Sequence, residues 1–241
     1  MNKTSISKLV ALLIISISLT SCSNKLKEFN QKLRIGPISS NSFEVMGNKI
    51  PLNGDNWYLI THNLNRDQWL DIRLFKIEEG VLAEYITIAY REKVVARGGY
   101  MPSKVCNRKN LYFLNMLANT RGSNQECWLV NHNTGLSFSG NNKSSVETQK
   151  YVADNEILLP KTVIQRFHRF ANKRSNYLSV SYHYNPEISG FEPDKSDKWS
   201  NSDWNRINVA SDSRKTQYLE NIVETGKQIH QKIKNSLAFI F

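Results

Sequence analysis

The sequence predicts an α+β domain, an antiparallel sheet built from hairpins with helices packed on it. Two observations lead to this prediction. Apolar and polar residues alternate along several short segments that turn-forming residues separate, which is typical of β-hairpins. Near the end of the chain the apolar residues instead recur at three- and four-residue steps, as in an amphipathic helix. Adjacent hairpins form an antiparallel sheet, which helices then cover.

The alternating segments give the expected strands. These lie at 43–46, 49–52, 57–61, 70–76, 82–90, 111–116, 126–131 and 177–184. Gly47 and Asn48 tolerate the positive φ that the first tight turn requires, and Glu79 and Gly80 turn the long hairpin. The segment 137–145 is rich in Gly, Asn and Ser, so we expect a polar loop there.

Two helices are expected in the second half of the chain. The first covers about 160–173, because Pro160 suits a first helical turn and four apolar residues fall on one face. Those four are Val163, Ile164, Phe167 and Phe170. The second helix covers about 213–238, and Ser211 or Asp212 could cap it. Its apolar positions are Leu219, Ile222, Val223, Gly226, Ile229, Ile233 and Leu237.

The first residues of the chain have the composition of a secretory signal. Lys3 and Lys8 precede an apolar run over 9–19, which is too short for the roughly 20 residues of a membrane-spanning helix. The run ends in Leu19-Thr20-Ser21-Cys22, which resembles the lipobox of bacterial lipoprotein precursors. That resemblance implies that the Cys22 sulfur receives diacylglycerol and that cleavage before Cys22 frees an amine for acylation. The alternatives are an uncleaved anchor or an ordinary signal cut nearby.

These features divide the chain into three parts. Residues 1–21 are the expected signal peptide, 22–42 a lipidated N-terminus and tether with a short helix near 26–33, and 43–241 a single α+β domain. Several acyl chains hold a protein stably in a bilayer. Ser23, rather than Asp, follows the cysteine. By the sorting rule of enteric-type lipoproteins, this implies the periplasmic face of the outer membrane.

Two cysteines remain once Cys22 is assigned to the lipid. Cys106 and Cys127 form an even pair in an exported chain, so we expect a disulfide. The rival interpretation is a metal site that adds His132, but no CxxC or HxxxH spacing supports it. We therefore expect neither a metal nor a cofactor.

The chain is basic, with a formal net charge of +11. Removing residues 1–21, which contain Lys3 and Lys8, leaves +9. This charge suggests an anionic envelope surface as partner, such as acidic lipid head groups, and makes a solvated basic surface the alternative. Nucleic acid is the least expected partner. The basic residues gather in two stretches, at 91–109 and at 166–174.

The sequence lacks the GxSxG, P-loop, HExxH and GxGxxG motifs. Two spots are candidate sites. His183 lies near Glu187 and could take part in acid–base chemistry, unless it is an ordinary strand residue. The loop 191–208 carries Trp199, Trp204 and several carboxylates that could bind a hard cation, unless the tryptophans only pin a solvated loop.

Taken together, the sequence predicts a lipid-anchored envelope protein that acts as a non-enzymatic binding or assembly module. One alternative is an envelope hydrolase or transferase that uses His183 and nearby carboxylates. Another is an accessory factor of a secretion or conjugation apparatus. The pattern Phe43…Gly47…Ile50-Pro51-Leu52…Trp57, with the closing helix, also resembles PsbP-like domains. That resemblance bears on the fold and implies no function.

Overall fold

A computed structural model describes residues 25–92, 99–136, 138–173 and 176–239. The chain folds into an eight-stranded sheet in which all neighbouring strands are antiparallel. In sheet order the strands are β1 (Gly36–Ile38), β4 (Trp57–Leu64), β5 (Trp69–Glu78), β6 (Val81–Arg91), β10 (Tyr177–Tyr184), β9 (Thr162–Ala171), β8 (Gln125–Thr134) and β7 (Phe113–Ala118). The predicted α+β architecture is confirmed.

A separate hairpin and several helices complete the fold. The hairpin is β2 (Ser42–Val45) with β3 (Asn48–Pro51). The helices are a segment at 25–32, α2 (Lys143–Asp154), α3 (Arg206–Val209) and α4 (Ser213–Asn235). Short 3-10 turns are η1 (Val105–Asn107), η2 (Pro186–Ser189) and η3 (Trp199–Asn201). Among the described helices, none combines the length and apolar character that a membrane crossing requires.

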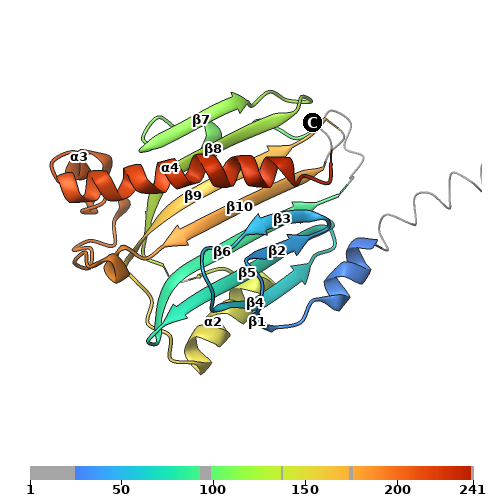
Figure 1. The fold of residues 1–241 in the computed structure, drawn as a ribbon, viewed down its shortest axis with the longest axis horizontal. Helices are drawn as coiled ribbons and strands as arrows, with labels where there is room; N and C mark the ends of the chain where they lie inside the picture. Colours follow the sequence, from blue (N-terminus) through green and yellow to red (C-terminus); the bar gives the residue numbers. More distant parts are fainter. Residues whose placement is uncertain (1–24, 93–98, 137, 174–175, 240–241) are drawn as a thin grey trace, which may run out of the picture.

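The two faces of the sheet are covered by different elements. Helix α4 and the β2–β3 hairpin lie on one face, and α2 lies on the other (Figure 1). Along β5 the side chains alternate between them: Leu74 packs under the hairpin, whereas Phe75 meets Tyr151 of α2. Because both faces are covered, the central strands are buried on both sides, and polar residues on them lie in the interior.

Several predicted elements are confirmed. The hairpins at 43–52 and 70–90 and the strand at 177–184 are present, and the last helix begins at Ser213 as expected. Asp212 caps it, because its Oδ1 accepts hydrogen bonds from the backbone N–H groups of Arg214 and Lys215. Helix α4 ends at Asn235, three residues before the predicted end.

The helix predicted at 160–173 is wrong, because Thr162–Ala171 is strand β9. Its side chains alternate instead, with Ile164 and His168 toward α4 and Val163 toward α2. Both faces of this central strand are buried, so apolar and polar residues do not alternate along it and the two-residue period of a strand is not visible in the sequence. The β-branched residues at its start, Thr162 to Ile164, favour a strand.

Two further departures concern the segments beside helices, although the short helix expected near 26–33 is itself confirmed at 25–32. Residues 143–145 of the expected loop at 137–145 belong to the first turn of helix α2. The Asn142 side chain caps this turn by accepting a hydrogen bond from the Ser145 backbone N–H. The folded part of the chain also begins earlier than 43. The helix at 25–32 packs on the core through Leu26, which is 2% exposed, and β1 pairs with β4. Most of the predicted tether is therefore structured.

The predicted disulfide between Cys106 and Cys127 is confirmed. It joins the η1 turn to β8 with a Cα–Cα distance of 6.2 Å, within the range of about 4.4–6.8 Å usual for disulfides. The two cysteines are 21 residues apart in sequence. A crosslink that closes a loop of this size typically stabilises a protein by about 3 kcal/mol.

Candidate functional site

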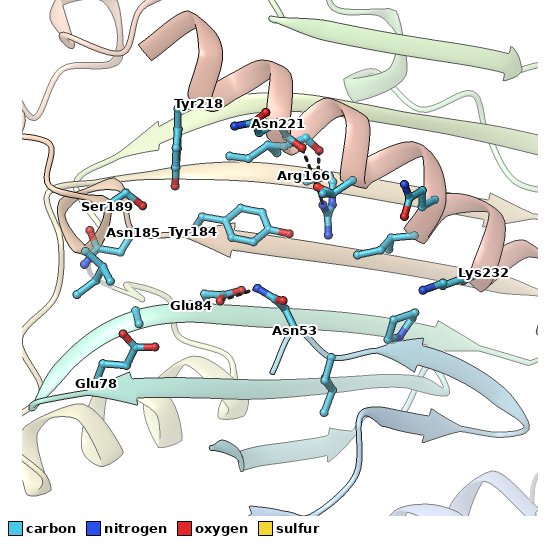
Figure 2. A pocket seen from close by; sticks show the side chains of 18 residues that line it. Asn53, Glu78, Glu84, Arg166, Tyr184, Asn185, Ser189, Tyr218, Asn221 and Lys232 are labelled. Carbon is cyan, nitrogen blue, oxygen red and sulfur yellow. Dashed lines mark hydrogen bonds between the residues drawn. The ribbon is translucent and has the colours of Figure 1, made fainter. Parts of the chain in front are cut away.

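A cleft of about 520 Å³ opens between α4 and the chain that leaves the β2–β3 hairpin. Strands β6, β9 and β10 form its floor, and α4 forms one wall (Figure 2). The opposite wall is built by residues 51–53, which are the last residue of β3 and the two residues after it. A volume of this size lies within the range of about 300–1,000 Å³ that is usual for small-molecule sites.

A close approach of α4 to the sheet shapes the end of this cleft. Gly226 faces the sheet, and a Cβ placed there would lie 2.5 Å from Cζ3 of Trp128 and 2.9 Å from Cδ of Arg166. Such distances are far below normal van der Waals contact, so a side chain at 226 would push the helix away. The glycine therefore lets α4 lie directly on Trp128 and Arg166.

Arg166 is the most unusual residue that lines the cleft. It projects from β9, is 1% exposed, and its Nη1 donates to the Thr225 hydroxyl at 3.1 Å. The guanidinium carbon lies 4.6 Å and 5.2 Å from the ring centroids of Tyr182 and Tyr184, a cation–π arrangement. Its Nε has no partner within the described chain. Buried charges in proteins are normally paired, so this guanidinium is an exception.

Glu84 of β6 lies across the floor from Arg166 (Figure 2). Its Oε1 accepts from Lys76 Nζ at 3.4 Å and from Asn53 Nδ2 at 3.3 Å. Its Oε2 is buried and has no partner among the described residues. Burial raises the pKa of this carboxyl, although Lys76, Asn53 and Arg166 each oppose the shift.

A second polar cluster holds the last turns of α4 to the sheet. His230 Nε2 lies 3.0 Å from Glu126 Oε1, and Lys234 Nζ lies 2.9 Å from both oxygens of that carboxylate. His230 Nδ1 lies 3.1 Å from His168 Nδ1 on β9. Burial lowers the pKa of His168 well below 6.5, and the charge of Arg166 adds to that effect. Glu126, His168 and His230 are buried under the helix, Lys234 is half-buried at its edge, and the cluster positions α4.

The structure does not bring His183 and Glu187 together. His183 faces the other side of the sheet from the cleft and stacks on Tyr85, with ring centroids 3.9 Å apart. Burial lowers its pKa to about 3, so its imidazole is neutral at ordinary pH. Glu187 lies in η2, where its carboxylate accepts from the Lys161 backbone N–H. His183 is a packed interior residue in this arrangement.

The two candidate tryptophans pin the loop 191–208 to the sheet. Trp199 stacks on His132 with centroids 4.9 Å apart, and its Nε1 donates to the His132 carbonyl. Trp204 is 1% exposed and packs edge-on against Phe191. Asp194 anchors the same loop by accepting from the hydroxyls of Thr162 and Ser202. No cluster of metal-ligating residues occurs in the described part of the chain.

Several described residues of the two basic stretches are buried or stacked on aromatic rings. Arg166 and Arg169 lie on opposite faces of β9, where they are 1% and 4% exposed. In the first stretch, Arg91 lies over Trp69 and Arg108 over Trp199. Lys93, Arg97 and Arg174 lie outside the described residues, as does Cys22.

Glu84 is a cleft residue that the sequence pattern indicates but that was not among the predicted site residues. Glu84 is in phase with Ile86, Ile88 and Tyr90 along its strand, so the alternation already turned a carboxylate toward the core face. Arg166 could not be found the same way, because the expected helix placed it on a solvated surface.

Comparison with protein-family models, curated proteins and solved structures gives no match for this chain. The resemblances to lipoprotein precursors and to PsbP-like domains stay predictions.

Proposed function

We propose that this chain is a lipid-anchored bacterial envelope protein whose folded domain is a non-enzymatic binding module. The cleft between α4 and residues 51–53 is its binding site. The observation that supports the cleft most directly is Arg166, a buried guanidinium that lines a cavity of ligand size and has no carboxylate within 4.0 Å among the described residues. The lipobox and the disulfide both fit an exported protein.

The described residues that line the cleft include no converging set of catalytic groups, which favours binding over hydrolysis or transfer. Catalysis requires a nucleophile or a base with partners within hydrogen-bond reach in one pocket. His183, the sequence candidate, is buried on the opposite face from the cleft. Glu84 lines the cleft, but its described partners are Lys76 and Asn53 rather than an activated hydroxyl or thiol.

The anchor would hold the domain close to the bilayer. Only residues 23 and 24 separate Cys22 from the helix at 25–32. The three Cα–Cα steps from Cys22 to Lys25 can span at most about 11 Å. Four basic residues near that point are exposed, Lys25, Lys27, Lys32 and Arg34. Each basic residue near an anionic bilayer contributes about 1 kcal/mol, so this segment supports the anionic membrane surface as a second partner.

The anchor is tested by Cys22→Ala. We expect this variant to lose all metabolic labelling by fatty acid and to accumulate as a longer, uncleaved form, since both steps require the cysteine sulfur. Labelling and mass spectrometry of the membrane fraction measure both. A variant that is still labelled and cleaved would show that the lipobox prediction is wrong.

The cleft is tested by filling it. We expect a water-soluble or organic extract of the envelope to raise the melting temperature of the full-length protein, because a ligand that binds only the folded state stabilises it. Asn221→Trp, on the exposed cleft side of α4, should abolish the rise. Glu224→Trp, which lies outside the cleft on the same helix, should retain it. Equal rises for both variants, or no rise in the unmodified protein, would contradict the proposal.

A further inference from the structure

We infer that the ligand of the cleft is a small polar molecule with a carboxylate or phosphate group, and that this anionic group binds to Arg166. This inference rests on the proposed function, because it names the ligand class of the same cleft.

The charge balance at Arg166 carries the inference. An arginine side chain stays charged in proteins and offers five N–H donors in a planar fork. Within the described chain its hydrogen-bond acceptor is Thr225 Oγ1, and no carboxylate lies within 4.0 Å of the guanidinium. The Tyr182 and Tyr184 rings offset part of the charge. A guanidinium that is 1% exposed and still has an unused donor is preorganised for an anion.

The surroundings favour a carboxylate or phosphate on a small molecule. Lys232 contributes a second positive charge at the far end of the cleft (Figure 2). Leu52, Ile188 and Ile229 supply apolar lining. A cavity of about 520 Å³ holds a small molecule or one head group, not a folded partner. The planar fork of arginine matches the geometry of two oxygens on one carboxylate or phosphate.

The Glu84 carboxyl determines which second chemical group the ligand needs beside its anionic group. Its carboxyl lines the same floor, so a bare anion on Arg166 is repelled by it. A ligand that also carries a hydroxyl or amine could donate to the unpartnered Oε2. Removing the charge with Glu84→Gln should therefore strengthen the binding of a simple anion, whereas removing positive charge should weaken it.

The test is a titration of the full-length protein in neutral maltoside micelles, observed through the ¹⁵N resonance of the Arg166 Nε–H group. Inorganic phosphate and acetate are the probes. We expect a saturable shift with a dissociation constant of about 1–10 mM for at least one of them. Repeating the titration in micelles that contain phosphatidylglycerol separates the sources. A lipid phosphate in the cleft would shift the resonance before any phosphate is added, and a free ligand would not.

Variants decide whether the shift reports this site. Arg166→Lys keeps the charge without the fork and should weaken binding about tenfold. This variant lacks the Arg166 Nε–H group, so its titration is followed through the backbone amide of Thr225, the residue that Arg166 contacts. Lys232 is exposed at the rim of the cleft, and Lys232→Gln should weaken binding about threefold. Lys227→Gln removes the same charge from the other flank of α4 and should change nothing. If Arg166→Lys fails to fold, Lys232→Gln and Glu84→Gln carry the test with opposite expected changes.

Three results would overturn the inference. They are no saturable shift with either anion, affinity that Lys232→Gln and Glu84→Gln leave unchanged, and equal weakening by Lys227→Gln. If envelope extracts stabilise the protein through the cleft but neither anion binds, the proposed function stands and the ligand class is wrong. If anions bind but no extract stabilises the protein, the proposed function fails instead.

Discussion

Replacing Gly226 by alanine is expected to lower the free energy of unfolding by about 2 kcal/mol, although alanine normally stabilises a helix interior by about 1 kcal/mol relative to glycine. The added methyl group would lie 2.5 Å from the indole of Trp128, which is itself 1% exposed and cannot move aside. Helix α4 would have to lift from β8 and β9. That movement strains the contacts of Arg166 with Thr225 as well.

Urea unfolding at neutral pH measures the effect of Gly226→Ala. Lys227→Ala is the matched control, since Lys227 is exposed and its described ion pair is with Glu224 on the same helix. We expect the control to change stability by less than about 0.5 kcal/mol. A Gly226→Ala protein that is as stable as the control would mean that α4 does not lie directly on Trp128.

Local sequence patterns are sufficient to predict two kinds of element in this fold. The hairpin at 70–90 was found because one of its faces is strongly apolar and its turn contains Gly80. Helix α4 was found because one side of it faces solvent throughout, which leaves the helical period visible in the sequence. An element reveals its period when one of its faces is clearly more apolar than the other.

Strand β9 has no wet side, which explains why it was misassigned. Arg166 and Arg169 are polar but buried, so treating them as a solvated face produced a helical pattern that the fold does not use. Their partners, Tyr182 and Tyr177, lie on the neighbouring strand. Strand pairing between residues distant in sequence makes these environments, and no local window of sequence contains it.

Acidification is expected to destabilise the protein through its buried, neutral histidines. In the folded state the pKa of His183 is lowered to about 3 by burial, whereas an unfolded histidine titrates near pH 6.5. Above pH 6.5 neither state binds the proton, so the stability is fully present. As the pH falls from 6.5 toward 3, the unfolded state gains a proton that the folded state excludes, and stability is lost. At pH 5 this single group should cost about 2 kcal/mol.

His183→Phe tests the assignment of this effect. Phenylalanine preserves the stack on Tyr85 and cannot take a proton, and His183 Nδ1 has no described partner whose bond would be lost. We expect the loss of stability between pH 7.5 and pH 5, measured by urea unfolding, to be about 2 kcal/mol smaller in this variant than in the unmodified protein. His168 and the carboxyls titrate equally in both proteins, so their contributions cancel in the comparison.

Tyr85→Phe is the matched control for the pH experiment, because it keeps the ring beneath His183 and leaves the histidine in place. Its pH dependence should equal that of the unmodified protein. The difference in pH-dependent stability loss between His183→Phe and the unmodified protein also measures how well this face of the sheet excludes water. A pH dependence identical in all three proteins would mean that water reaches His183 and that its folded pKa is near 6.5. The α2 face would then be open to water, and a His183 imidazole that titrates near pH 6.5 could serve as a catalytic base.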